Sequence, residues 1–117
     1  MAAPNVVNVA TITGKTAVQA VGTSATAIVS NSAASGKVFK VNALYVSNVD
    51  GTNNAEITVD LFRSSTAYKI ANTVTVPADA SLDVLSKAIY LEEGDSLRLT
   101  ANASGDLEAV CSYEEIS

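Results

Sequence analysis

Apolar and polar residues alternate in short stretches along most of this chain. The clearest stretch places Ile57, Val59 and Leu61 at every second position, with polar residues between them. A period of two puts these three side chains on one face, as in a β-strand with one buried side. Residues 50–54, which precede this stretch, are Asp, Gly, Thr, Asn and Asn, and these types favour turns. Residues 41–62 are therefore predicted to form two strands joined by a turn.

Comparable stretches, separated by turn-forming residues, continue along the whole chain. They predict strands at 5–13, 16–21, 25–29, 37–49, 56–63, 68–76, 82–84, 87–91, 96–101 and 107–113. Helical periodicity is lacking, and at most one helical turn fits within residues 79–87. About eight to ten short strands without intervening helices predict an all-β fold, an antiparallel β-sandwich of jelly-roll or Ig-like type.

The longest predicted strand, 37–49, differs from the others because both of its faces are apolar. Apolar residues occupy both sets of alternate positions: Phe39, Val41, Ala43 and Tyr45 are in one set, and Val38, Leu44 and Val46 are in the other. Two explanations fit this pattern: both faces of the strand are covered, or a β-bulge shifts its register midway. Either explanation predicts a central strand of the sheet, or a strand that also meets a partner.

The length of 117 residues predicts one folded domain. A turn is expected at Gly14 and Lys15. It separates residues 1–14, an extended N-terminal arm or first strand, from residues 15–117, a single β-sandwich domain. The N-terminus lacks the basic and apolar regions of a secretory signal, and no apolar run has the length needed to span a membrane. Synthesis in the cytoplasm, without membrane association, is the expectation.

The charge is unevenly distributed between the two halves of the chain. Residues 1–49 contain three lysines and no acid, a net charge of +3, whereas residues 50–117 contain twelve acids against four bases, a net charge of −8. The total of −5 disfavours binding to a phosphate backbone, so no nucleic-acid partner is predicted. The asymmetry has two interpretations: ordinary solvated surfaces, or unlike halves of neighbouring copies that meet in an assembly.

Catalytic chemistry is not predicted anywhere in the chain. Histidine is absent, which removes the usual general base and the commonest metal ligand. Cys111 is the single cysteine and lies in an alternating apolar stretch, so it is expected to be a small buried residue. The acidic pairs lie on predicted turns, where solvated carboxylates are the norm. We therefore predict a protein that is not an enzyme and has no catalytic residue, no cofactor and no metal.

Two weaker alternatives stay open. Oxygen atoms of Asp50, Asn53 and Asn54 in one loop, or of the acidic turn 92–95, could bind calcium, although neither spacing is that of an EF-hand. Four tyrosines, one per predicted strand, could contribute to a carbohydrate site if they were clustered and exposed. The expectation is instead that each ring packs in or caps the core.

Four stretches carry a resemblance to one group of proteins. They are LYVSNVDGTNNAEITVDLF, the strand end Val76-Pro77-Ala78, the pair LEEGDSLRLTA and the closing LEAVCSYEEI. In this succession of strand and turn types, residues 37–116 resemble small β-rich virion structural proteins of tailed bacteriophages, including cyanophages and their marine relatives. The resemblance implies a β-sandwich located in the virion. It carries over no functional residues, because the shared pattern contains none.

The function that this resemblance implies is structural. It indicates a capsid decoration or cement subunit, which stabilises the head shell by binding in many copies. The alternatives are a neck, collar or tail component in a ring, and a carbohydrate-binding or host-recognition module. The implied partners are other copies of the chain in a homo-oligomer, together with the major capsid protein or neck and tail proteins.

Partner contacts are expected at three places. An acid-free N-terminal arm could add a strand to a neighbour's sheet, the lysines of the first half could meet an acidic surface, and the 50–54 loop is an exposed turn. The candidate contact residues are Val7, Val9, Lys15, Lys37, Lys40, Asp50, Asn53 and Asn54.

Overall fold

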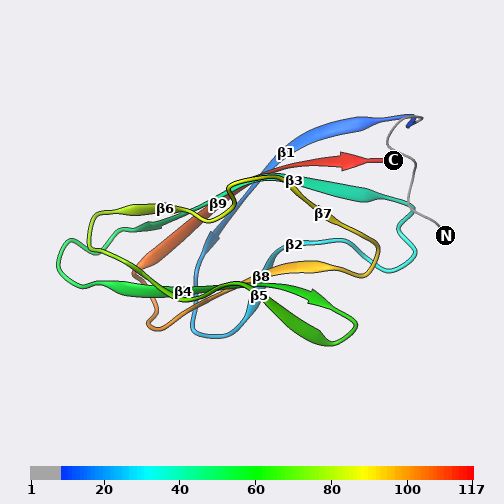
Figure 1. The fold of residues 1–117 in the computed structure, drawn as a ribbon. Helices are drawn as coiled ribbons and strands as arrows, with labels where there is room; N and C mark the ends of the chain where they lie inside the picture. Colours follow the sequence, from blue (N-terminus) through cyan, green and yellow to red (C-terminus); the bar gives the residue numbers. More distant parts are fainter. Residues whose placement is uncertain (1–8) are drawn as a thin grey trace.

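The computed structural model describes residues 9–117, and this part of the chain contains nine β-strands and no helix (Figure 1). The strands are β1 (Ile12–Ala20), β2 (Thr26–Ser30), β3 (Val38–Asn48), β4 (Ala55–Arg63), β5 (Thr66–Val76), β6 (Ser81–Asp83), β7 (Ile89–Leu91), β8 (Ser96–Ala101) and β9 (Leu107–Ile116). The all-β prediction is confirmed, and the number of strands lies within the predicted range.

The strands form two antiparallel sheets that pack face to face (Figure 1). One sheet has the order β1-β9-β3-β6, with β7 also paired to β3, and the other has the order β2-β8-β4-β5. Successive strands therefore switch sheets except at the β4–β5 hairpin and between β6 and β7. This order is that of an eight-stranded jelly roll whose sixth strand is split in two, as β6 and β7. Of the two predicted sandwich types, the jelly roll is the one observed.

The hydrophobic core lies between the sheets. Leu44, Val46 and Cys111 face it from the five-stranded sheet, and Ile57 and Leu97 face it from the four-stranded sheet. All five side chains are fully buried, as the alternating pattern predicts. Burial raises the pKa of the Cys111 thiol to about 11, so this cysteine behaves as the small buried residue that was expected.

The apolar pattern on both faces of β3 is explained by a bulge. The register of β3 with β9 shifts between Val41 and Ala43. Phe39 and Val41 face the core before the shift, and Leu44 and Val46 face it afterwards. The bulge therefore moves the buried positions from odd to even residue numbers, which confirms one of the two explanations drawn from the sequence.

The turn predicted at Gly14 and Lys15 is wrong, because both residues lie within β1. The strand pairs with β9 without interruption, from Ile12 opposite Ile116 to Ala20 opposite Glu108. A glycine weakens a strand but does not break it when both neighbours pair, and a Cβ at Gly14 would meet no atom within 4 Å. Residues 12–14, placed with the arm by the sequence, belong to this strand.

Different loops gather at the two ends of the sandwich. The termini end, on the right in Figure 1, holds residues 31–37, 64–65, 92–95 and Ser117. The acidic end, on the left, holds the loops 49–54, 77–80 and 102–106. Its acidic residues are Asp50, Glu56, Asp79, Asp106 and Glu108. No ion pair within residues 9–117 includes any of these five acids, so the acidic end carries uncompensated negative charge.

Candidate assembly interface

The described residues bring no set of reactive groups together. Among residues 9–117, no three His, Cys, Asp or Glu side chains are placed to hold a metal ion, and no helix has the length and apolarity to cross a membrane. A shallow hollow of about 350 Å³ lies over β1 and β9, and another of about 210 Å³ lies over β4, β5 and β8. Each contains a single carboxylate, from Glu108 or Glu56. The features left to consider are the sheet edges and the outer faces.

Three edges of the two sheets carry features that discourage pairing with another chain. β2 is short, and its register with β8 shifts between Ala27 and Val29. β6 and β7 have three residues each. β5 is long, but its register with β4 shifts twice, and Thr73 within it adopts a left-handed φ of 48°. Short edge strands and bulges are the devices by which β-proteins prevent association at open edges.

The β1 edge has none of these protections. Its nine residues pair with β9 in one continuous register, and its single charged residue is Lys15. The Lys15 ammonium is held at 2.9 Å from a Glu115 carboxylate oxygen, so its charge is partly compensated within the subunit. A long, regular and almost uncharged edge is the kind that accepts a further strand.

The hydrogen bonds at both ends of β1 establish which backbone groups point outward. Thr11 and Ser117 exchange two backbone bonds of 2.9 Å, and the Val21 N–H donates to the Leu107 carbonyl at 2.9 Å. Because inward and outward pairs alternate in an antiparallel ladder, odd-numbered residues bond to β9. The N–H and C=O groups of Ile12, Gly14, Thr16, Val18 and Ala20 therefore point to the open edge. Within residues 9–117 none of them has a backbone partner.

The outer face of the five-stranded sheet continues this edge with apolar side chains. Val18 is 75% exposed and lies opposite Val110 on β9, which is 42% exposed. Val110 in turn lies opposite Tyr45 on β3, which is 48% exposed. Three exposed apolar side chains thus form a row across three neighbouring strands, and the row ends at the open edge.

The predicted contact residues fall into two separate groups. At the termini end, Lys15 and Lys37 share the carboxylate of Glu115, at 2.9 and 3.2 Å. Hydrogen bonding from Lys15 lowers the pKa of Glu115, and the same bond raises the pKa of Lys15. Lys40 lies on β3 opposite Glu114. The structure therefore brings these three lysines to the same end of the five-stranded sheet.

The loop residues of the prediction lie at the acidic end. One Asp50 oxygen accepts hydrogen bonds from the Thr52 and Asn53 N–H groups, and the other accepts from the Asn53 side-chain amide. These bonds lower the pKa of Asp50, with the Thr52 N–H as the largest cause. Asn54 accepts a bond from the Ala78 N–H and ties the loop to its neighbour. These oxygens therefore already have partners in the turn.

The remaining predicted contacts are N-terminal. Val9 is half-buried and precedes β1, whereas Val7 lies outside the described residues. The arm hypothesis for residues 1–14 is therefore addressed only over residues 9–14, of which 12–14 lie in β1.

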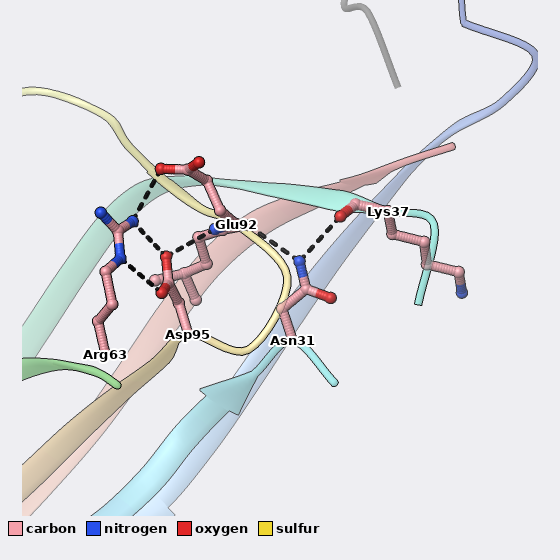
Figure 2. Close-up of polar contacts among 6 residues, drawn as sticks. Asn31, Lys37, Arg63, Glu92 and Asp95 are labelled. Carbon is pink, nitrogen blue, oxygen red and sulfur yellow. Dashed lines mark hydrogen bonds and ion pairs between the residues drawn. The ribbon is translucent and has the colours of Figure 1, made fainter. Parts of the chain in front are cut away.

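Several buried polar side chains were not anticipated from the sequence. At the termini end, Asp95 accepts two bonds from the Arg63 guanidinium, which also reaches Glu92 at 2.8 Å (Figure 2). The bonds from Arg63 hold the pKa of Asp95 below its usual range. The buried Asn31 amide donates to the carbonyls of Lys37 and Leu91 (Figure 2). This network joins three segments that are distant in the sequence, and it rigidifies the end instead of creating a reactive site.

A matching arrangement stabilises the acidic end. Asn48 is 2% exposed, and its amide donates to the carbonyls of Asn53 and Val76 at 2.9 Å each. Its side-chain oxygen accepts the Asp50 N–H. The only sequence signal for these asparagines is their place at the end of a strand.

The expected packing of the tyrosines holds for one of the four. Tyr113 lies against Phe39, with ring centroids 5.7 Å apart. Tyr45, Tyr68 and Tyr90 are 46–57% exposed, because their strands present these positions to solvent. They lie on three different strands and in two different sheets, and therefore do not form the clustered aromatic surface that a carbohydrate site requires.

Comparison with known proteins adds information about the fold. No protein-family model matches the chain, and no curated protein matches it. Among solved structures, a protein from Bacillus endospore appendages that form disulfide-linked pili superposes with a TM-score of 0.54. It shares 15% identity, over 92% of this chain and 88% of that one.

Two structures of a pentameric capsid protein from metagenomic phage sequences also match, with TM-scores of 0.43 and 18% identity. The matches cover 86% of this chain but only 60% and 62% of the capsid chains. These scores are too low to support an inference. The similarity to the appendage protein, at its low identity, establishes a shared fold and no shared function.

Proposed function

We propose that this protein is a non-enzymatic structural subunit that acts in many copies, as a decoration or cement subunit on the head shell of a tailed bacteriophage. The observation that carries the proposal is the open β1 edge, since the other sheet edges are blunted and this one is regular, long and almost uncharged. A protein that keeps such an edge is expected to cover it in its working state.

Two further features support this assignment. The strand and turn types of residues 37–116 resemble virion structural proteins, and jelly rolls are common among viral capsid domains. The appendage protein with the same fold belongs to structures described as disulfide-linked pili. A disulfide link is not expected to transfer to this chain, because its single cysteine, Cys111, is fully buried.

The proposed mechanism is stabilisation by mass action. A subunit that binds only the assembled shell shifts the equilibrium between intact and disrupted particles toward the intact form. No chemical step is required. This mechanism agrees with the lack of histidine and with the absence, in residues 9–117, of a cluster of reactive side chains.

The test is the copy number of this chain in purified particles, measured by quantitative mass spectrometry against the major capsid protein. Hundreds of copies per particle support a decoration subunit, whereas about a dozen would assign the protein to a ring in the neck, collar or tail. Glycan binding by the isolated protein that disappears in Tyr45→Ala would instead favour a host-recognition module. Absence from particles would overturn the proposal.

A further inference from the structure

We propose that two copies of this chain associate by pairing β1 with β1 in antiparallel orientation, about a two-fold axis that passes beside Thr16. The two five-stranded sheets then become one continuous sheet, with the two β1 strands at its centre. This inference rests on the proposed function, because it names the partner that covers the open edge. The partner is a second copy of the same chain.

The hydrogen-bonding groups of β1 favour one register. The outward-pointing backbone groups belong to the even residues from Ile12 to Ala20, and Thr16 is the middle one. With Thr16 opposite Thr16 of the second copy, Ile12 lies opposite Ala20, and Gly14 lies opposite Val18. All five outward residues then pair, so no donor or acceptor of the strand remains unsatisfied. A shift of two residues in either direction would leave some of these groups unpaired.

The side chains on the outer face are self-complementary in this register. Val18, the most exposed large apolar residue at 75%, lies opposite Gly14, which has no side chain and open space where a Cβ would be. Ile12, 55% exposed, lies opposite the small Ala20. The two Thr16 side chains face each other, a favourable cross-strand pair. On the outer face, the two large apolar side chains of each strand are therefore matched with small residues of the other.

The charge distribution favours the antiparallel orientation. Antiparallel pairing places the acidic end of one copy beside the termini end of the other. The acidic end has five acids without ion pairs, whereas the bases of the termini end are balanced by acids beside them: Glu115 binds Lys15 and Lys37, and Glu92 and Asp95 bind Arg63. Parallel pairing would place the two acidic ends side by side. Antiparallel pairing therefore avoids repulsion between two acidic ends, and added salt is expected to reduce this preference over the parallel orientation.

The size of the contact predicts a reversible dimer. Nine paired residues span roughly 30 Å along the strand, and two sheet edges in contact bury less than the roughly 1,000 Å² that stable complexes exceed. Main-chain hydrogen bonds contribute most of the affinity. We therefore expect association at micromolar concentrations, which assembly in many copies on a common surface would strengthen.

Disulfide trapping tests the register. The Cα atoms of the two Thr16 residues would be about 5.5 Å apart, within the range of a disulfide. Thr16→Cys is expected to form a covalent dimer on mild oxidation. Val18→Cys is the matched control: it lies on the same strand and face and is highly exposed, but the two copies would be roughly 14 Å apart. The wild-type protein is the control for Cys111. This thiol is buried, so wild type should form no covalent dimer.

The expected result is trapping of Thr16→Cys at least about tenfold faster than Val18→Cys at equal concentration, because paired thiols have a high effective concentration. Mixing Gly14→Cys with Val18→Cys is expected to give the mixed dimer. Faster trapping of Val18→Cys than of Thr16→Cys would overturn the register. If neither is trapped while sedimentation shows self-association, β1 pairing is overturned and the proposed function stands. If the protein is monomeric and absent from particles, both proposals fail.

Discussion

The β1 and β5 edges of this jelly roll are both long open strands, but one is regular and the other is bulged. β1 has nine residues in unbroken register with β9, whereas β5 has eleven residues whose register with β4 shifts twice. A regular edge presents evenly spaced donors and acceptors, and a bulged edge does not. Since one chain contains both, the regularity of β1 is not a general property of its strands. This contrast supports the proposed pairing of β1 with a second copy.

The bulge in β5 is stabilised by a specific hydrogen bond. Thr73 adopts a left-handed φ of 48°, which is unfavourable for a β-branched residue. Its N–H is turned out of the regular ladder and donates to the Thr58 hydroxyl on β4 at 3.0 Å. The strain at Thr73 is therefore offset by a specific contact, and the β5 edge is kept irregular.

The largest effect should come from proline substitutions at adjacent positions of β1. Ala17 bonds to β9, so Ala17→Pro leaves the Cys111 carbonyl unpaired and is expected to cost about 1–3 kcal/mol from that loss alone. The Thr16 N–H points to the open edge, so Thr16→Pro should preserve the monomer fold and abolish dimer formation. Thermal unfolding and sedimentation of both variants check this.

The two variants differ by a single position, which makes the comparison self-controlled. If Thr16→Pro and Ala17→Pro destabilise the monomer equally, the assignment of outward residues in β1 is incorrect. If Thr16→Pro still dimerises with unchanged affinity, the subunits associate through another surface.

Much of the fold follows from the sequence because period-two alternation survives wherever one face is buried. β4 and β8 follow their predicted patterns, with Ile57 and Val59 or Leu97 and Leu99 inside. The apolar residues on both faces of β3 had two explanations, and the register shift between Val41 and Ala43 confirms the bulge. Where one face is buried, the alternation predicts both that the stretch is a strand and which of its side chains face the core.

The features that escaped prediction depend on partners distant in the sequence. Asp60 belongs to the outward positions of β4 but is 1% exposed, because Arg98 from β8 covers it and also lies over the Phe62 ring at 3.9 Å. The alternation expected in β5 fails at its two register shifts. No local pattern reveals an ion pair between strands, or an edge bulge whose hydroxyl partner lies on another strand.

The open edge of β1 was missed for a related reason. Its residues alternate only weakly, and Gly14 resembles a turn signal when it is considered alone. Only the pairing with β9 shows that the strand continues through this position. The covered face of β1 is only partly buried, at Ala17 and Gln19, so it imposes a weak pattern and the extent of the strand is determined by its neighbour.

A smaller effect is expected at the β5 bulge. Thr58→Val removes the acceptor of the Thr73 N–H and should cost about 0.5–1.5 kcal/mol, measured by urea unfolding. Thr100→Val is the control, because Thr100 lies directly opposite Thr58 on β8 and makes no bond to the bulge. Equal effects of the two substitutions would show that the hydroxyl bond does not stabilise the bulge. Neither change should affect dimer formation.

Relief of the strain at Thr73 should raise the free energy of unfolding, by a still smaller amount. Glycine adopts a left-handed conformation without steric cost, so Thr73→Gly is expected to stabilise the protein by about 0.5–1 kcal/mol. Thr75→Gly, on the same strand with ordinary backbone geometry, should destabilise it by a similar amount. Chemical denaturation of both variants checks this, and loss of stability in Thr73→Gly would mean that the bulge is not strained.

The smallest effect concerns the charge at the β1 edge. The bond from Lys15 lowers the pKa of Glu115, so the stability that this carboxylate contributes is present above its usual pKa of about 4.3 and is lost as pH falls through the lowered value. Below that pH, Lys15 is released and stands as a free charge on the edge. Glu115→Gln should therefore abolish this part of the acid dependence of both unfolding and dimer formation.

The effect of Glu115 is expected to be modest, because both lysines that it binds are substantially exposed and surface ion pairs contribute little. Urea midpoints and sedimentation at pH 7 and pH 3, compared between wild type and Glu115→Gln, measure it. An identical loss of dimer on acidification in both proteins would mean that Lys15 does not control the edge. A loss confined to wild type would link the ion pair to association, and would explain why a strand with one lysine can still accept a partner.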